Sequence, residues 1–212
     1  MTGFPAPGAT LHADFATWPA GREIHRVHHA RFGSTDFNAS SAGSARFSPI
    51  ADAASGKTIP TLYGGGSFEG AAMETVFHDV PYTAGFKTYD KAKLSGRRAS
   101  IIRPLRDLLL VDLSSKALRK LGIPRSGLIE CDAADYPKTR IWAVALHAQC
   151  PKADGLSWVS HQDDEARALM LFGDRLKRTD LAEVQPPADI VSDPALFQQL
   201  LDLAQRIGVY TI

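Results

Sequence analysis

The chain has 212 residues, 44% of them hydrophobic and 22% charged, with 24 basic and 23 acidic side chains and a formal net charge of +1. This length and composition are typical of one globular domain with a substantial core, and the charge balance argues against a non-specific nucleic-acid binder, which needs a basic excess. No apolar run approaches the length of a transmembrane span, and residues 1–15 lack the pattern of a secretory signal. We therefore expect a cytoplasmic protein with no direct contact to membrane or nucleic acid.

Cysteine usage agrees with a reducing compartment. The chain has two cysteines, Cys131 and Cys150, and their spacing is not C-x-x-C. Two isolated cysteines indicate neither a disulfide framework nor a zinc site, and we expect both thiols to be free.

The chain begins with a predicted extension and continues as one predicted domain. The extension covers residues 1–21 and holds a short helix at 11–18 that ends before Pro19. The domain covers residues 22–212, and its first strand is expected at 23–28, where polar and apolar residues alternate.

A long polar loop and a glycine run surround the second predicted strand. Residues 33–57 are dominated by Gly, Ser, Ala, Asn and Asp, and loops of this length are usually functional or disordered. The strand at 58–63 is expected to end at the triple glycine 64–66. Ser67 is a good N-cap for a helix that runs to about His78.

The second half of the chain mixes strands and helices without a regular βαβ order. This favours an α+β fold with a mixed β core and flanking helices over a doubly wound α/β fold. The expected elements are strands at 99–103 and 108–113, a short helix from Ser114 or Ser115 to Gly122, a helix at 139–149, a strand pair at 155–159 and 167–172, and a C-terminal helix at 193–207.

Glu74 is the first candidate for chemistry. It is expected inside a mostly apolar helix, between Met73 and Val76, where a buried carboxylate needs a partner or a function. The alternative is an ordinary surface glutamate. Glu69 lies in the first turn of the same helix, where the helix dipole and capping already explain an acidic residue.

Two arginines are candidates for binding phosphate. Arg26 lies in the first strand on the same face as Ile24 and His28, and its planar guanidinium suits a bidentate phosphate contact. Arg46 lies in the Ser-rich loop, where backbone N–H groups could also meet an anion. The alternatives are an edge-strand arginine and a solvated loop arginine.

Tyr63 and Ser160 are candidates for contacting a ligand. Tyr63 ends a strand beside glycines that permit close backbone approach, and Ser160 ends the strand G-L-S-W-V. Either residue could instead pack or cap locally. No G-x-S-x-G motif surrounds Ser160, so a hydrolase-type nucleophile is disfavoured.

A metal site is not expected. The spacing of His25, His28 and His29 is H-x-x-H-H in a strand, which points His28 away from the other two, and no Cys/Asp/Glu cluster of ligand spacing is near.

These segments together resemble the RES domain family, named for an arginine, a glutamate and a serine. The resemblance rests on R-V-H-H with Arg26, S-A-R-F-S-P with Arg46, T-L-Y-G with Tyr63, A-A-M-E-T-V-F with Glu74, and D-G-L-S-W-V-S with Ser160, and it covers roughly residues 22–175. It implies that 22–212 is a single RES-like domain with an ADP-ribosyltransferase-like fold.

The resemblance also implies a function. Family members are typically toxins that degrade NAD by hydrolysis or phosphorolysis and are neutralised by an Xre-type helix-turn-helix antitoxin. NAD would be the substrate, inorganic phosphate a candidate co-substrate, and no metal would take part. An alternative is a protein ADP-ribosyltransferase that uses the same site, and another is a non-catalytic nucleotide-binding module.

The residue roles implied for this chain follow from breaking the nicotinamide–ribose bond. Glu74 would stabilise the positive charge that develops on the ribose. Arg26 and Arg46 would hold pyrophosphate or phosphate, Tyr63 would stack on nicotinamide or ribose, and Ser160 would hydrogen-bond the ribose or the carboxamide. Glu74, Arg26 and Ser160 are thus the expected catalytic residues, and Arg26, Arg46, Tyr63 and Ser160 the expected ligand-binding residues.

Overall fold

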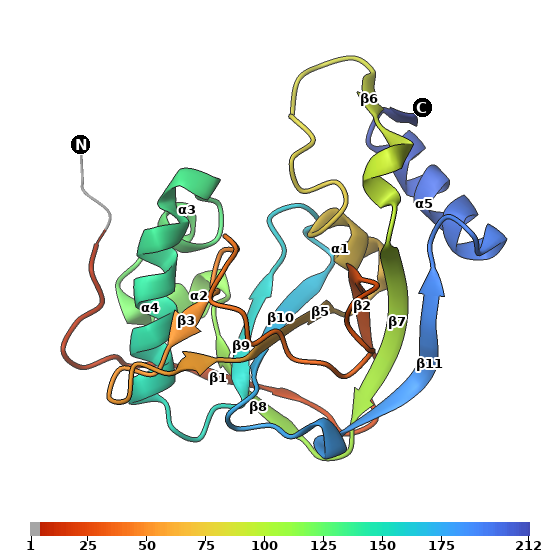
Figure 1. Cartoon of the computed structure of the whole chain (residues 1–212). Helices are drawn as coiled ribbons and strands as arrows, with labels where there is room; N and C mark the ends of the chain where they lie inside the picture. The colour runs from red at the N-terminus through yellow and green to blue at the C-terminus, as the bar shows by residue number, and fades with distance from the viewer. Residues whose placement is uncertain (1–4) are drawn as a thin grey trace.

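A computed structural model describes residues 5–212, and its main feature is one eight-stranded sheet (Figure 1). The strands of this sheet are β1 Phe15–Trp18, β2 Ile24–His29, β5 Thr61–Gly65, β7 Arg97–Pro104, β8 Leu108–Asp112, β9 Gly155–Val159, β10 Arg167–Phe172 and β11 Leu181–Asp189. Their order across the sheet is β1-β8-β9-β10-β5-β2-β7-β11. Neighbouring strands are antiparallel, except for the parallel pair of β8 and β9.

Shorter elements surround this sheet. Two small ladders pair β3 Ile50–Ala51 with β4 Thr58–Ile59, and β6 Lys87–Tyr89 with β12 Val209–Thr211. The α-helices are α1 Phe68–Met73, α2 Ser115–Leu121, α3 Arg125–Leu128, α4 Tyr136–Gln149 and α5 Pro194–Arg206, and the single 3₁₀ turns are η1 Lys91–Leu94, η2 Ala133–Asp135 and η3 Arg178–Asp180. Within residues 5–212, none of the helices has the length and apolar character needed to span a bilayer.

The sheet curls around its own inner face. Trp18 of β1 and Leu181 of β11 belong to strands at opposite edges of the sheet, yet both belong to one buried cluster with Leu169 and Leu171 of β10. A flat sheet would hold these edge strands far apart. The curl lets one set of alternating side chains form a continuous core.

Two groups of helices cover the outer face of the sheet. Helices α2, α3 and α4 pack on the β8, β9 and β10 side, with Trp142 and Leu146 fully buried there. Helices α1 and α5 pack on the β2 and β7 side with Leu200 and Leu203. Figure 1 shows the two groups on opposite sides of the molecule, which leaves the middle of the outer face between them.

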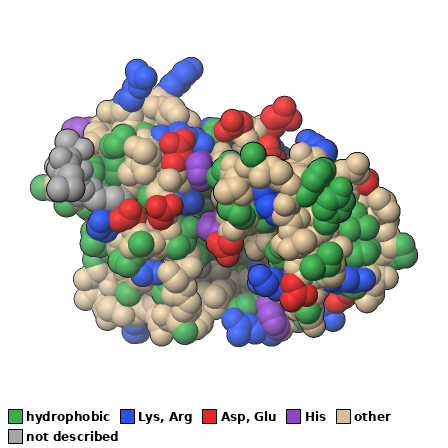
Figure 2. Space-filling view, turned by 90° about the horizontal axis from the view of Figure 1, so that it is seen from above, with side chains coloured by type: hydrophobic (Ala, Val, Ile, Leu, Met, Phe, Trp, Pro, Cys, Tyr) green, Lys and Arg blue, Asp and Glu red, His purple; other side chains and the backbone are tan. Residues whose placement is uncertain are grey.

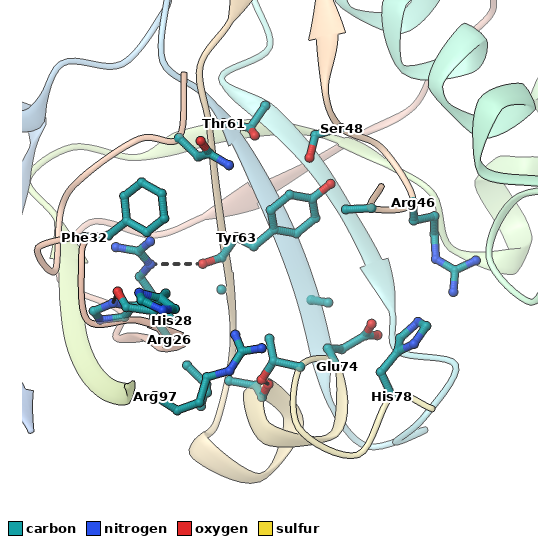
Figure 3. A pocket seen from close by; sticks show the side chains of 18 of the residues that line it. Arg26, His28, Phe32, Arg46, Ser48, Thr61, Tyr63, Glu74, His78 and Arg97 are labelled. Atoms are coloured by element: carbon teal, nitrogen blue, oxygen red, sulfur yellow. Dashed lines mark hydrogen bonds between the residues drawn. The ribbon is translucent and has the colours of Figure 1, made fainter. Parts of the chain in front are cut away.

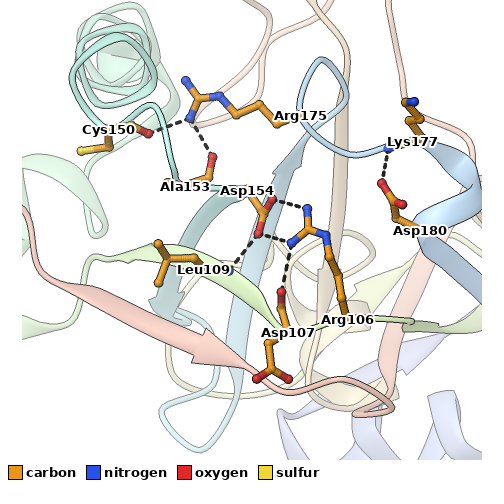
Figure 4. Close-up of polar contacts among 9 residues, drawn as sticks. All are labelled: Arg106, Asp107, Leu109, Cys150, Ala153, Asp154, Arg175, Lys177 and Asp180. Atoms are coloured by element: carbon orange, nitrogen blue, oxygen red, sulfur yellow. Dashed lines mark hydrogen bonds and ion pairs between the residues drawn. The ribbon is translucent and has the colours of Figure 1, made fainter.

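Partly buried polar contacts connect the starts of β8 and β9 (Figure 4). The carboxylate of Asp154 accepts from both terminal nitrogens of Arg106, at 2.8 and 2.6 Å, and from the backbone N–H of Leu109 at 2.9 Å. Arg175 donates to the carbonyl of Cys150 at 2.8 Å, just past the end of α4. The Asp154 contacts join the starts of β8 and β9 to each other, and the Arg175 contact joins the turn after β10 to the end of that helix.

The α+β expectation is confirmed, and so are most of the expected elements. Strands β2, β7 and β8, the antiparallel pair β9 and β10, and the helices α2, α4 and α5 lie where the sequence predicts them. Gly122, expected to end α2, has a φ of 75° and lies in the left-handed region that favours glycine.

The short helix expected at 11–18 is wrong. Residues Phe15–Trp18 form β1, an edge strand that pairs with β8, so that Trp18 lies opposite Leu108. The side chain of Trp18 is buried in the inner core. Tertiary pairing therefore overrides a local pattern too short to specify a helix. Residues 1–4 of the predicted extension lie outside the described residues.

Two further boundaries differ from the expectation. The expected strand 58–63 is divided between β4, which pairs with β3, and β5, and it does not end at the triple glycine, because Gly64 and Gly65 belong to β5 and pair with β10. Helix α1 ends at Met73 instead of His78. The Thr75 hydroxyl donates to the Ala71 carbonyl at 2.6 Å, and the three successive N–H groups of residues 75–77 share the Ala72 carbonyl, which tightens the chain into a turn.

Strand β11 was not expected from the sequence. Four consecutive residues of β11 are exposed and only Leu181 is buried, the strand contains Pro186 and Pro187, and its ladder with β7 has two irregularities. Prolines and bulges are tolerated at a sheet edge because one side of the strand needs no ladder partner, and they hide the period-two pattern of a strand.

Candidate active site

A cavity of about 560 Å³ opens on the outer face where β2 and β5 separate. These two neighbouring strands share a single ladder pair, His25 with Gly65. Close approach requires Gly64 next to it, because a Cβ there would lie 2.4 Å from Cγ2 of Ile24. Beyond this pair the Nε–H of Arg26 donates to the Tyr63 carbonyl at 3.1 Å, so a side chain replaces the missing ladder bond.

The cavity has walls from both halves of the fold. It is lined by β2 and the loop after it, the Ser-rich loop, β5, helix α1 with its following turn, and the starts of β7 and α4. Figure 2, a view from above, shows a hollow near the middle of this face with acidic, basic and histidine side chains around it. The volume is typical of a small-molecule site.

Glu74 lies immediately after helix α1 and lines this cavity. Its Oε1 is buried and has no hydrogen-bond partner among the described residues. A carboxylate at the C-terminal end of a helix is not explained by the helix dipole, which favours acidic groups at the other end. A buried, unpaired carboxylate oxygen that faces a cavity is the feature expected of a group that meets a ligand.

Glu69 has an ordinary structural role, as the sequence predicts. Its carboxylate forms an ion pair with Arg206 of α5 at 2.7 Å, and its side chain is 45% exposed. It does not line the cavity. The two acidic residues of this segment are therefore distinguished by their surroundings.

Arg46 lies on the other side of the cavity from β2, in the Ser-rich loop (Figure 3). Its guanidinium lies 5.2 Å from the centre of the Tyr136 ring, and Nη1 donates to the carbonyl and sulfur of Cys131 at 3.3 and 3.4 Å. The Thr139 hydroxyl of α4 donates to the Arg46 carbonyl and holds the loop backbone. Several N–H groups of Arg46 remain free to meet an anion.

Tyr63 lines the cavity between Arg46 and Glu74. Burial raises the pKa of its phenol, with Arg46 lowering and Glu74 raising it, which places both charges near the ring. The hydroxyl accepts from the backbone N–H of Phe47 at 3.3 Å, and the ring meets Trp158 edge-on with centroids 6.4 Å apart. The ring is thus fixed in place before any ligand arrives.

Arg26 is buried and its fork is largely occupied. Four of the five N–H donors of a guanidinium are directed at backbone carbonyls: those of Tyr63, Gly33, Ser34 and Asp36. Burial lowers the pKa of Arg26 to about 10, so the group stays protonated at neutral pH. The structure gives Arg26 the role of holding the loop that follows β2, and its contact with substrate stays a prediction.

His28 belongs to the same wall and is neutral at physiological pH. Burial, with the nearby charges of Arg26 and Arg98, lowers its pKa to about 4. Its Nδ1 lies 3.2 Å from the His29 carbonyl, which can only accept, and its Nε2 lies 2.9 Å from the Ser100 hydroxyl. Both ring nitrogens therefore have protein partners. No cluster of metal-ligating side chains occurs in residues 5–212.

Ser160 is fully buried and is not among the cavity-lining residues. Its hydroxyl accepts from the backbone N–H groups of Gln162 and Asp163, at 3.0 and 3.2 Å, and so supports the turn after β9. Gln162 in turn donates to the carbonyl of His78, in the turn that follows Glu74, at 3.3 Å. Ser160 is therefore connected to the cavity through this turn, and its catalytic role stays a prediction.

The sequence did not point to three further lining residues, which are His78, Tyr136 and Arg97. The Nε2 of His78 lies 2.8 Å from the Tyr136 hydroxyl, and its Nδ1 lies 2.9 Å from Asp79. This chain of hydrogen bonds joins the turn after α1 to the start of α4. Its members are widely separated in sequence, so no local motif marks them.

Comparisons with known proteins agree with this architecture. The RES domain family model matches residues 23–194. Among solved structures, the MbcT toxin in the crystal structure of the M. tuberculosis MbcT–MbcA toxin–antitoxin complex is similar, with a TM-score of 0.60 and 18% identity over 88% of this chain and 91% of that chain. A sequence search of curated proteins finds no match. The family model spans most of the chain and includes every candidate site residue, and the chain belongs to the RES domain family.

Proposed function

We propose that this protein is a toxin that cleaves the nicotinamide–ribose bond of NAD. The observation that carries the proposal is the buried, unpaired Oε1 of Glu74 in a cavity large enough for a substantial part of a dinucleotide. The family membership supports it, because RES proteins are expected to act on NAD. The fold is also similar to that of the MbcT toxin in the MbcT–MbcA toxin–antitoxin complex.

The chemistry follows from the charge that develops during cleavage. As the bond between ribose C1 and the nicotinamide nitrogen breaks, the electron pair leaves with nicotinamide and positive charge appears on the ribose. The Glu74 carboxylate, whose Oε1 is buried, stabilises this charge at close range. Water or phosphate then adds to C1, and the proton that it loses passes to Glu74 or to solvent.

The acceptor is positioned by groups on the Arg46 side. Arg46 has free N–H donors and, like Glu74, lies near the rings of Tyr63 and Tyr136. An inorganic phosphate bound to Arg46 would lie on the side of the cavity from which Glu74 can orient it. Addition of water gives ADP-ribose, and addition of phosphate gives ADP-ribose phosphate.

Control of the activity would come from a partner protein. We propose an Xre-type helix-turn-helix antitoxin that binds over the cavity, as the family resemblance implies. Co-expression with such a protein should prevent NAD loss in cells. Persistence of NAD loss in a stable complex of the two proteins would contradict this part of the proposal.

The experiment that tests the function is incubation of the purified protein with NAD, with and without phosphate, and identification of the products. We expect free nicotinamide and either ADP-ribose or its phosphate. Glu74→Gln should lower kcat by about 100-fold or more, because it removes a preorganised charge. Glu69→Gln is the matched control and should stay within about twofold of the native rate. A Glu74→Gln enzyme with near-native turnover would disprove the assignment.

The same incubation separates the two alternative functions. With NAD labelled in its adenylate part, label that becomes attached to protein indicates ADP-ribosyl transfer. Binding of NAD without any release of nicotinamide indicates a non-catalytic nucleotide-binding module. Tyr63 and Glu74 would line the ligand site in either case, so only the products distinguish these functions.

A further inference from the structure

Four arginines line the cavity, and they differ in what their guanidiniums already bind. Arg26 directs four of its five N–H donors at backbone carbonyls. The Arg46 guanidinium donates through Nη1 to the carbonyl and sulfur of Cys131 and lies over the Tyr136 ring, and its other N–H groups have no hydrogen-bond partner in the described part of the chain. Arg31 is exposed, and its guanidinium lies 4.8 Å from the centre of the Phe32 ring. The backbone carbonyl of Arg97 accepts from the N–H of Ile190, but its guanidinium makes no hydrogen bond or ion pair within the described part of the chain.

The occupied fork of Arg26 limits what it can do with an anion. A bidentate contact to phosphate needs two parallel N–H groups on one edge of the guanidinium. Arg26 has one N–H left, and its other donors hold the loop that follows β2. Another cation must therefore supply a two-pronged contact on this side of the cavity.

Arg97 is placed to do so. It begins β7, lies opposite His29 in the ladder with β2, and is partly buried. Figure 3 shows its side chain extending from the start of β7 toward the middle of the cavity, between His28 and Glu74 in this view. The other two carboxylates of the lining have partners other than Arg97, because Asp36 pairs with Arg178 at 2.7 Å and Asp79 with His78 at 2.9 Å.

A cation and a carboxylate thus line one cavity without forming an ion pair. Glu74 and Arg97 both line the cavity, Oε1 of Glu74 is buried without a hydrogen-bond partner, and the two side chains form no ion pair in the described part of the chain. Opposite charges held apart in this way fit a ligand that carries both charges, positive near Glu74 and negative near Arg97. NAD has this character, with a cationic nicotinamide ring at one end of its ribose and a pyrophosphate beyond the other.

We propose that Arg97 is a substrate-binding residue that contacts a phosphate group through its free guanidinium edge. This inference rests on the proposed function and adds the residue that recognises phosphate on the β7 side. The phosphate belongs either to the pyrophosphate of the dinucleotide or to the inorganic co-substrate, and the two sources are separable by binding.

The test is calorimetric binding of three probes to the full-length protein. ADP-ribose carries the pyrophosphate, orthophosphate stands for the co-substrate, and adenosine has no phosphate. Arg97→Gln should weaken ADP-ribose binding about tenfold or more, a loss of about 1.4 kcal/mol, and leave adenosine binding unchanged. Arg97→Lys should restore part of the affinity, because it keeps the charge but not the fork. Arg103→Gln, on the exposed part of the same strand, should bind like the native protein.

Each outcome has a defined meaning. Loss of orthophosphate binding alone would assign Arg97 to the co-substrate, and loss of ADP-ribose binding alone to the dinucleotide, and both support the proposal. Native affinity of folded Arg97→Gln for both phosphate probes would overturn it, as would the absence of binding of both to the native protein. Arg97-dependent ADP-ribose binding in a protein that releases no nicotinamide would refute the proposed activity and leave this site standing.

Discussion

The Nε–H of Arg26 donates to the carbonyl of Tyr63 at 3.1 Å, at the point where β2 and β5 stop pairing. One side chain therefore satisfies a backbone group that the separating strands leave behind. The same guanidinium reaches the carbonyls of Gly33, Ser34 and Asp36, so the gap in the sheet and the loop beside it depend on a single cation. The site and its scaffold are joined at this residue.

Replacing Arg26 should reduce stability as well as activity. Arg26→Gln removes the charged donor from several buried carbonyls, and we expect the free energy of unfolding to fall by about 3 kcal/mol. Arg26→Lys keeps the charge but cannot reach all four acceptors, and should also be destabilised. Denaturant unfolding measures both, with Arg103→Gln as the exposed control. Native stability in an inactive Arg26→Gln protein would show that the arginine acts on substrate alone.

Gly64 should be the essential member of the triple glycine. A Cβ at Gly64 would lie 2.4 Å from Ile24 Cγ2 and 3.1 Å from the His25 carbonyl oxygen, whereas at Gly66 the nearest atom is 3.7 Å away. We expect Gly64→Ala to lower the free energy of unfolding by about 2 kcal/mol through overpacking. Gly66→Ala should change it little. Equal thermal stability of the two variants would contradict the close approach of β2 and β5.

His28 should make the fold sensitive to acid. Its pKa is lowered to about 4 in the folded protein, against 6.5 for an ordinary histidine. Between these values the unfolded chain binds the additional proton, so stability is full above pH 6.5 and falls as the pH drops through 4, by up to about 3 kcal/mol. Unfolding free energies of native protein and His28→Gln between pH 4 and 7 measure this. Parallel curves for the two proteins would disprove the prediction.

Elements with a local sequence signal were predicted correctly, and elements that depend on long-range packing were not. Strands with regular alternation and helices with good caps were predicted because their signals are local, as for Ser67, whose hydroxyl accepts from Gly70 N–H at 3.0 Å. The length of α1 was overestimated because Val76 and Phe77 are buried by a turn, and burial alone does not distinguish a turn from a helix.

The residues of the candidate site also divide into those with a local signal and those placed by the fold. Glu74, Arg46 and Tyr63 were predicted and do line one cavity. Arg97 and Tyr136 were not, because their place there depends on the pairing of β7 with β2 and on the packing of α4, which no local pattern records. Likewise, the partners of a guanidinium are invisible in sequence, so the occupied fork of Arg26 emerges only from the fold.

Ser160 gives the clearest test of whether a site residue acts directly or through its neighbours. Its hydroxyl accepts two backbone N–H bonds in the turn after β9 and lies outside the cavity lining. Ser160→Ala leaves two partly buried donors without this acceptor, and we expect a loss of about 1 kcal/mol in unfolding free energy. Ser160→Thr keeps the acceptor and should keep most of this stability.

We expect NAD turnover to depend on the integrity of the turn after β9 and not on a direct contact of the Ser160 hydroxyl with substrate. Gln162, which follows Ser160, donates to the carbonyl of His78 beside Glu74, so a loosened turn reaches the cavity through this bond. We therefore expect the loss of NAD turnover in Ser160→Ala to be matched by Gln162→Ala, which leaves the serine in place. Steady-state kinetics and thermal unfolding of both variants provide the measurement. The opposite result is a Ser160→Ala protein with native stability and a strongly raised KM for NAD, together with a Gln162→Ala protein that stays active. That result would place the serine hydroxyl on the substrate, because only a direct contact separates binding from folding in this way.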